Sequence, residues 1–424
     1  MTNRRRFIQG AAASGVALCG AHVSNARSAT NNVPASKDPA LAAALATLKS
    51  DMHGLVDRHE RSGIAYGVML RGRLVALDGY GLRDRARNLP MTPDTICRLF
   101  SMTRAISTVA FLTLVEEGKV GLDDPVAKFV PAFGQTQVLR LVDGKVSGLE
   151  PQASPMTVRH LLTYTSGLAY PQEYPAELKV VQSELMGPNI DTVAGIDKLA
   201  KIPLVHQPGS RWTYGFSGDV LGRIAEVASG QPFDRFLHER LLDRIGMKDT
   251  DFWMRPPAVD RLAKAYGPVG TDKLADVNSQ WQPEYGTFDK PIPFLSAGGG
   301  LASSTTDYLR FLQLLLNGGE IDGVRILKPE TMKDMLTGHA SLVPGLAYRP
   351  NAAFGYGLAV LDDKAQRPFG IASQEAGWFG VANTTFFVDP QHQLAAVGMT
   401  QYFGSGFGLF PETFRNAVYR LIAT

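Results

Sequence analysis

The sequence predicts a mixed α/β protein of the α+β type, in which helices flank one antiparallel sheet and an all-helical lobe is inserted. Three observations support this fold class. Segments with strand character lie far apart, at residues 63–81 and 377–400, so we expect the sheet to join both ends of the chain. Helical patterns separated by proline and glycine fill the middle, roughly from 156 to 285. The 424 residues are 45% hydrophobic and 20% charged, an ordinary globular composition that can bury a large core.

The first 29 residues have the order of parts found in a twin-arginine export signal. Residues 4–7 (RRRF) precede a short run of small and apolar residues at 11–21, and small residues follow near the end of the segment. The apolar run is too short to span a bilayer, so we expect no stable membrane insertion. The pattern predicts a periplasmic or secreted protein whose mature chain begins near Thr30. The alternative is a basic tail on a cytoplasmic protein.

Periodicity predicts the elements of the first part of the chain. Apolar residues recur at helical spacing from 38 to 59, which predicts a helix. Short apolar runs broken by glycine at 63–81 predict a hairpin. The segment 94–100 then leads into an apolar helix that begins at Ser101 and is ended by Gly118.

Caps, glycines and turn residues predict further helices and a pair of strands near the end of the chain. The helices are expected from Thr157, from Asp219 to Ala228 with a stop at Gly230, from Thr306, and from Pro411 to Ile422. The two strands are expected within 377–400, joined by a turn at 388–391.

Charge and cysteine content exclude several classes of function. The chain carries 43 basic and 40 acidic residues, and beyond the first few positions no basic run is interleaved with aromatic residues, so we expect no nucleic-acid binding. The sequence has no His-Glu-x-x-His spacing and no cysteine cluster, so no metal site is expected. Beyond the export signal only Cys97 remains, which excludes an intramolecular disulfide. No heptad repeat sets an oligomeric state.

Ser101 is the strongest candidate for a catalytic residue. It opens an apolar helix, where unpaired backbone N–H groups and the positive end of the helix dipole favour developing negative charge. Arg104 lies one turn later on the same face, so both side chains can reach one cleft. Enzymes with this spacing normally carry a lysine at the second position. Arg104 stays charged and has no acceptor lone pair, so it can stabilise a charge but cannot be the general base.

Tyr214 is the candidate base. It lies in a loop just before the helix that starts at Asp219, and its hydroxyl can titrate if a fixed cation nearby stabilises the phenolate. From this segment alone, a tyrosine packed under a loop is the simpler interpretation.

Four stretches resemble the serine β-lactamase and penicillin-binding protein superfamily, in particular the branch of class C β-lactamases and family VIII carboxylesterases. The stretches are Ser101 with its helix and residues 122–126 (LDDPV), residues 157–168 (TVRHLLTYTSGL), Tyr214 with residues 219–222 (DVLG), and residues 377–381 (GWFGV). The resemblance covers nearly the whole chain after the export signal. It implies a β-lactamase/transpeptidase-like fold and a single hydrolase domain at 30–424.

The resemblance also implies acyl transfer through an acyl-enzyme on Ser101, without a cofactor. Tyr214 falls on the family's catalytic tyrosine. The backbone N–H groups of Ser101 and Val381 fall on the family's oxyanion hole, which stabilises the negative charge of the tetrahedral intermediate.

Two departures from the β-lactamase pattern bear on the substrate. Trp378, Phe379 and Gly380 replace a lysine-bearing triplet, and Phe216 stands where β-lactamases place an asparagine. We therefore assign these four residues to substrate binding and expect uncharged esters or amides, with weak or no β-lactam hydrolysis. Aromatic residues such as Tyr164 and Tyr170 can line an acyl pocket, although core packing is the default for each.

Arg104 leaves two functions open. In the first, Arg104 is a fixed cation that keeps Tyr214 as a phenolate, and the protein is a serine hydrolase or acyltransferase. In the second, the site is catalytically silent and binds a peptidoglycan fragment or a small acyl compound.

Overall fold

The computed structural model describes residues 33, 36–175, 178, 180, 184–186, 189–280, 287–342, 352–361, 368–404 and 409–423. The expected export signal at 1–29 lies outside the described residues. In the part of the chain that is described, no helix combines the length and the hydropathy needed to span a bilayer.

The core element is one large antiparallel sheet. Within the described residues it has nine strands, in the order β12-β13-β14-β15-β16-β17-β1-β2-β3. Their bounds are β1 Gly63–Leu70, β2 Arg73–Asp84, β3 Leu89–Pro90, β12 Ala340–Ser341, β13 Ala353–Phe354, β14 Ala359–Val360, β15 Ala376–Gly380, β16 Thr384–Asp389 and β17 Leu394–Met399.

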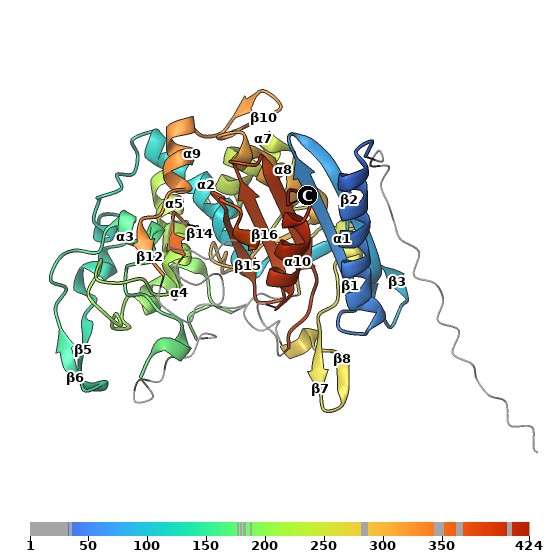
Figure 1. Cartoon of the computed structure of the whole chain (residues 1–424). Coiled ribbons are helices and arrows are strands. Elements are labelled where there is room, and N and C mark those ends of the chain that lie inside the picture. Colours follow the sequence, from blue (N-terminus) through green and yellow to red (C-terminus); the bar gives the residue numbers. More distant parts are fainter. Residues whose placement is uncertain are drawn as a thin grey trace, which may run out of the picture.

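The sheet joins the two ends of the chain, as predicted. β1 pairs with β17, with Ala65 opposite Met399 and Leu70 opposite Leu394. In Figure 1 the blue strands of the N-terminal part continue directly into the red strands of the C-terminal part. Every residue of β1, β16 and β17 is buried, because helices cover both faces of the sheet here.

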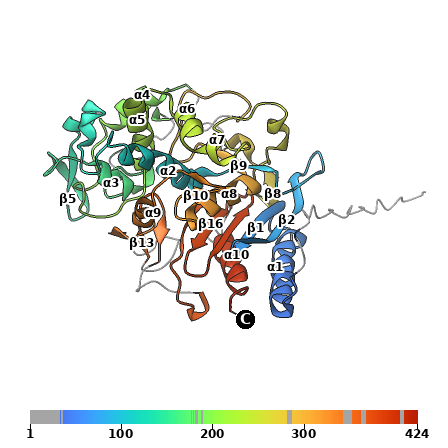
Figure 2. The same ribbon diagram turned by 90° about the horizontal axis from the view of Figure 1, so that it is seen from above.

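Helices from opposite ends of the chain cover one face. α1 (Pro39–Asp57) begins where the Asp38 carboxylate accepts hydrogen bonds from backbone N–H groups of its first turn. It packs with α10 (Leu409–Tyr419) over β1. α8 (Thr305–Leu316) packs on the opposite face, as the view in Figure 2 makes clear. These three helices confirm the predictions at 38–59, from Thr306 and at 411–422, with small differences at their ends.

The middle of the chain supplies most of the remaining helices. Their bounds are α3 Val158–Leu162, α4 Thr192–Leu199, α5 Ser217–Ser229, α6 Phe233–Leu237, a π-helix at His238–Leu242 and α7 Asp243–Ile245. A hairpin of β7 (Tyr266–Val269) and β8 (Asp272–Asp276) follows them. α5 ends at Gly230 with φ 72°, as its sequence predicts, and packs against the buried helix α2 (Thr103–Glu116).

The end of the chain differs from the prediction in one respect. The sequence predicts two strands within residues 377–400, but three strands, β15, β16 and β17, occupy residues 376–399. The additional reversal lies between β15 and β16, where Asn383 adopts φ 60° and its N–H donates to the Gly380 carbonyl. A tight turn of this kind carries no proline or glycine signal after Gly380, so the pattern reads as a longer strand.

Candidate active site

Ser101 lies at a sharp change of chain direction between a strand and a helix. The strand is β4 (Ile96–Arg98), which pairs with β9 (Ala302–Ser304), and the helix is α2. Phe100 adopts φ 47°, and a single 3₁₀ turn at Phe100–Met102 precedes α2. Ser101 is partly exposed, whereas its two neighbours are buried. The turn therefore presents the hydroxyl-bearing residue at the surface of an otherwise buried segment.

Strand β15 runs very close to this turn. A Cβ at Gly380 would lie 2.3 Å from the Leu99 carbonyl oxygen and 2.4 Å from Thr384 Oγ1, so glycine is required at this position. The next residue, Val381, packs in one small apolar cluster with Phe100. The backbone of Val381 is thus brought beside the segment that carries Ser101, which is where the predicted oxyanion hole would need it.

Arg104 is buried inside the protein, with 1% of its surface exposed. Its Nε donates a 2.7 Å hydrogen bond to the Tyr164 hydroxyl, and its Nη2 donates a 2.5 Å hydrogen bond to the Tyr170 hydroxyl. Nη1 is buried and has no hydrogen-bond partner in the described chain. Burial alone disfavours the charge, but the nearby Tyr164, Tyr170, Tyr214 and Asp219 outweigh it and raise the pKa of Arg104 above its usual value. Arg104 is a permanent buried cation.

Tyr214 lies directly on this cation. The guanidinium carbon of Arg104 is 4.4 Å from the centre of the Tyr214 ring, which is a cation–π contact. The Tyr214 hydroxyl oxygen accepts a 3.0 Å hydrogen bond from Trp378 Nε1. Trp212 stacks on the same ring, with centres 5.8 Å apart. The structure thus brings both Arg104 and Trp378 into contact with Tyr214.

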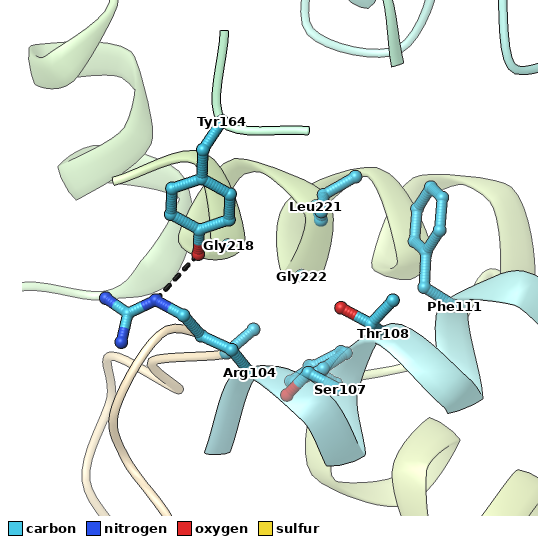
Figure 3. A pocket seen from close by; sticks show the side chains of 10 residues that line it. Arg104, Ser107, Thr108, Phe111, Tyr164, Gly218, Leu221 and Gly222 are labelled. Carbon is cyan, nitrogen blue, oxygen red and sulfur yellow. Dashed lines mark hydrogen bonds between the residues drawn. The ribbon is translucent and has the colours of Figure 1, made fainter. Parts of the chain in front are cut away.

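Tyr164 reaches Arg104 from a strained backbone conformation. Its φ of 56° lies in the left-handed region, which a tyrosine rarely adopts and which costs on the order of 1 kcal/mol. Hydrogen bonds hold it there, since the Thr213 N–H donates to the Tyr164 carbonyl at 2.8 Å and the Tyr164 N–H donates to the Leu161 carbonyl at 3.2 Å. Figure 3 shows the ring pointing from its loop toward α2, with its hydroxyl on Arg104 Nε.

Asp219 supplies a buried carboxylate near Arg104. It is 2% exposed in the first turn of α5, and its Oδ1 accepts hydrogen bonds from Ser296 Oγ at 2.6 Å and from the Gly298 N–H at 3.2 Å. Burial raises the pKa of Asp219, although the Ser296 hydrogen bond and the Arg104 charge act in the opposite direction.

A small cavity lies between α2 and α5 beside Arg104, with room for about one water molecule. Ten residues line it (Figure 3): Arg104, Ser107, Thr108, Phe111, Tyr164, Gly218, Leu221, Gly222, Phe233 and Ala297. The cavity is too small for a substrate. Among the described residues no group of three or more His, Cys, Asp or Glu side chains has the geometry of a metal site.

The residues assigned to substrate binding are mostly buried. Trp378 and Phe379 are 2% and 5% exposed and stack on each other, with ring centres 5.3 Å apart. Phe216, just before α5, is 2% exposed and lies edge-on to Tyr170. Substrate contact by these side chains stays a prediction, whereas the hydrogen bond from Trp378 to Tyr214 is a feature that sequence reasoning missed.

Comparison with known proteins identifies the family. The family model described as Beta-lactamase matches residues 48–418, which is most of the chain. The chain belongs to the beta-lactamase family. The match confirms both the resemblance seen in the four stretches and the fold class.

Relatives of this beta-lactamase family member include an esterase. The chain is 32% identical over 410 residues to "Esterase EstB" of Burkholderia gladioli, covering 91% of this chain and 99% of that protein. It is 34% identical over 355 residues to "Protein Rv1367c" of Mycobacterium tuberculosis, covering 80% and 86%. Among solved structures, it matches "EstCE1, a hydrolase with promiscuous acyltransferase activity" with a TM-score of 0.75 and 26% identity, covering 90% and 98%.

Tyr164 and Tyr170 are the site residues whose contacts sequence reasoning did not anticipate. Core packing is the default expectation for both aromatic side chains, but both hydroxyls bond to Arg104. The position of Tyr164 within the familiar stretch 157–168 was the available signal. The spacing along the chain carried no information, because the partners lie 60 and 66 residues from Arg104.

Proposed function

We propose that the protein is a serine hydrolase or acyltransferase that forms an acyl-enzyme on Ser101 from ester or amide substrates. The observation that carries this proposal is the contact between Arg104, one helical turn after Ser101, and the ring of Tyr214. Membership of the beta-lactamase family supports the same assignment, as do an esterase relative and a structural neighbour described as a hydrolase with acyltransferase activity.

In the first half of the reaction, Ser101 Oγ attacks the carbonyl carbon of the substrate and its proton passes to the Tyr214 oxygen. The carbonyl oxygen becomes an oxyanion, which accepts hydrogen bonds from the backbone N–H groups of Ser101 and Val381. When the intermediate collapses, the bond to the leaving alcohol or amine breaks, and the leaving group takes the proton from Tyr214.

In the second half, an acceptor attacks the acyl-enzyme. Tyr214 removes the proton from a water molecule or an alcohol while the oxygen of that acceptor bonds to the acyl carbon. The second intermediate then releases Ser101 Oγ, which recovers the proton. Water gives hydrolysis and an alcohol gives acyl transfer, so both outcomes share one chemistry. The steps use only groups of the chain and the substrate.

Tyr214 is the proposed base because Arg104 has no lone pair with which to accept a proton. Two contacts place a positive charge and a hydrogen-bond donor on Tyr214: the guanidinium lies on its ring at 4.4 Å, and the indole N–H of Trp378 points at its oxygen at 3.0 Å.

We propose uncharged esters or amides as substrates, with weak or no β-lactam hydrolysis. Position 378 carries tryptophan instead of the lysine of β-lactamases, so β15 offers no side-chain cation to a β-lactam carboxylate. We expect hydrolysis of p-nitrophenyl butyrate and little hydrolysis of a chromogenic cephalosporin. A protein with the reverse preference would contradict the proposed substrate class.

The test of the proposed function is nitrophenol release from this ester by wild type, Ser101→Ala, Tyr214→Phe and Arg104→Lys. We expect release by the wild type and its loss in the first two variants. A second function, ligand binding without turnover, is favoured by the missing amine at position 104. It would be supported by release that appears only in Arg104→Lys, and release that persists in Ser101→Ala would contradict the hydrolase.

We also propose export through the twin-arginine pathway to the periplasm or the medium. The support is the order of residues 4–29, and the mature chain is expected to begin near Thr30. The test is the intact mass of the protein recovered from a periplasmic extract, beside a variant with Arg4→Lys and Arg5→Lys. Retention of residues 1–29 in the wild type, or unchanged export of the variant, would contradict this proposal.

A further inference from the structure

We propose that Tyr164 and Tyr170 are positioning residues of the active site, which hold the guanidinium of Arg104 against the ring of Tyr214. Their two hydroxyls take the guanidinium N–H groups that would otherwise compete for the Tyr214 oxygen. Arg104 then acts on Tyr214 through the ring face, and the oxygen stays available to Trp378 and to the proton of Ser101. This inference rests on the proposed function, because it assigns roles within that site.

The hydrogen bonds define the orientation of the cation. Nε and Nη2 lie along one edge of the planar guanidinium, and each donates to a different hydroxyl, at 2.7 Å and 2.5 Å. Nη1 has no partner in the described chain, so these two bonds set the plane. With the plane set, the guanidinium carbon is 4.4 Å from the Tyr214 ring centre, closer than to the ring centres of Tyr164 (5.7 Å) and Tyr170 (5.9 Å).

Tyr164 is itself held with little freedom to move. Its backbone is in the left-handed region, pinned to the segment just before Tyr214 by the hydrogen bond from the Thr213 N–H. A Cβ at Gly218 would lie 2.9 Å from the Tyr164 hydroxyl, so the backbone of α5 packs closely against that oxygen. Strained conformations that the surrounding structure maintains are concentrated at functional sites. The strain here serves to aim one hydroxyl at Arg104 Nε.

Tyr170 also contacts Tyr214 directly, so it links the clamp, which consists of Tyr164, Tyr170 and Arg104, to that residue. Its backbone N–H donates to the Tyr214 carbonyl at 3.3 Å, and its ring lies edge-on to the Tyr214 ring, with centres 5.5 Å apart. Tyr170 is partly exposed, so its hydroxyl can be removed with little effect on the core.

The charges around Arg104 fit this role. The titratable groups that act on it in the described chain are Tyr164, Tyr170, Tyr214 and Asp219. Burial raises the pKa of Tyr164 well above its usual range, so Tyr164 accepts the hydrogen bond as a neutral phenol and does not itself neutralise the guanidinium. Oδ1 of Asp219 accepts hydrogen bonds from Ser296 and Gly298, and its Oδ2 is buried without a hydrogen-bond partner in the described chain. A lysine at position 104 has no planar edge and cannot occupy both hydroxyls in this orientation.

The kinetic test measures the rate of Ser101 acylation by p-nitrophenyl butyrate against pH, in wild type, Tyr164→Phe and Tyr170→Phe. Each substitution removes one hydrogen bond to a charged group, and we expect acylation to slow by about tenfold, with half-maximal rate reached at higher pH. In an Arg104→Gln background the same substitutions should change the rate by less than about twofold, because the cation they orient is gone. Tyr174→Phe, a buried tyrosine in a neighbouring cluster, is the matched control and should leave the rate unchanged.

A second readout does not depend on activity. In the wild type labelled with [¹⁵N]arginine, we expect a protected Nε–H signal that disappears in Arg104→Lys, and slow rotation of its Nη groups. Tyr170→Phe should accelerate that rotation, and this variant decides the outcome if Tyr164→Phe does not fold. Equal effects of the phenylalanine substitutions in wild type and Arg104→Gln, or an unchanged Arg104 signal in Tyr170→Phe, would overturn the inference. A wild-type protein in which Ser101 is never acylated by the ester would overturn the proposed function instead. The Arg104 signal would still decide whether the clamp exists.

Discussion

The indole N–H of Trp378 donates a 3.0 Å hydrogen bond to the hydroxyl oxygen of Tyr214. Trp378 stands where β-lactamases carry a lysine, so the position that holds a cation in those enzymes holds a neutral donor here. The neutral donor bonds to the Tyr214 oxygen, but it offers no long-range attraction to an anionic substrate.

Removing this donor should slow acylation while leaving the ring in place. In Trp378→Phe we expect the acylation rate to fall by about ten- to a hundredfold, the typical worth of one hydrogen bond to a charged oxygen. Stopped-flow release of nitrophenol measures it. Trp212→Phe is the matched control, because Trp212 stacks on the same Tyr214 ring and its own N–H has no partner among the described residues. Equal losses in both variants would show that packing, and not the donor, supports Tyr214.

A second prediction follows from the close approach of β15 to the turn that carries Ser101. Gly380→Ala would place a Cβ 2.3 Å from the Leu99 carbonyl and push the Val381 N–H away from Ser101. We expect acylation to fall by about 10²–10³-fold, as when an oxyanion-hole donor is lost. Gly134→Ala, where the nearest neighbour of the new Cβ is 3.4 Å away, is the control. Full activity in Gly380→Ala would remove Val381 from the proposed oxyanion hole.

A third prediction, on the stability of the fold, follows from the buried ion pair between Arg415 and Glu375. The two side chains are 3% and 0% exposed, with Nε and Oε2 2.5 Å apart. Arg415→Met leaves the buried carboxylate without its cation, so the free energy of unfolding should fall by about 3–5 kcal/mol. The double variant Arg415→Met/Glu375→Leu should be more stable than this single variant. Denaturant unfolding measures both, and a double variant less stable than Arg415→Met would contradict the prediction.

His238 should make stability depend on pH. Hydrogen bonds from the imidazole ring to Asp251, which has the larger effect, and to Asp243 raise the pKa of His238 to about 9, although burial acts to lower it. Because the folded pKa lies above the unfolded one, this contribution to stability is complete below about pH 6.5 and is lost as the pH rises through about 9. Unfolding midpoints measured between pH 6 and 10 should fall in the wild type and fall less in His238→Gln. Parallel curves for the two proteins would contradict the assignment of this pH dependence to His238.

Regular elements could be predicted because their patterns are local. The apolar spacing of 38–59 and the glycine at 230 determine where helices run and end, and the structure agrees. Several short strands could not be predicted. β12, β13 and β14 have two residues each, and β4 pairs with β9 through Ile96 and Ser304, so their existence depends on partners far along the chain.

The site also has one part that could be predicted from the sequence and one part that could not. Ser101 and Tyr214 stand in segments that resemble those of the family, so they could be named from the sequence. The contacts of Tyr164 and Tyr170 with Arg104 could not be predicted, because they depend on the packing of α5 against α2 and of α3 against α5. A left-handed tyrosine also leaves no mark in composition or periodicity. The chemistry of Arg104 was predictable from its residue type, but its orientation required the fold.

The most direct test of the central claim is the mass of the protein after brief exposure to p-nitrophenyl butyrate, followed by peptide mapping of any adduct. We predict an increase equal to one butyryl group, located on the peptide that contains Ser101 and absent in Ser101→Ala. An adduct on another residue, or ester cleavage that continues without Ser101, would contradict the assignment of Ser101 as the nucleophile.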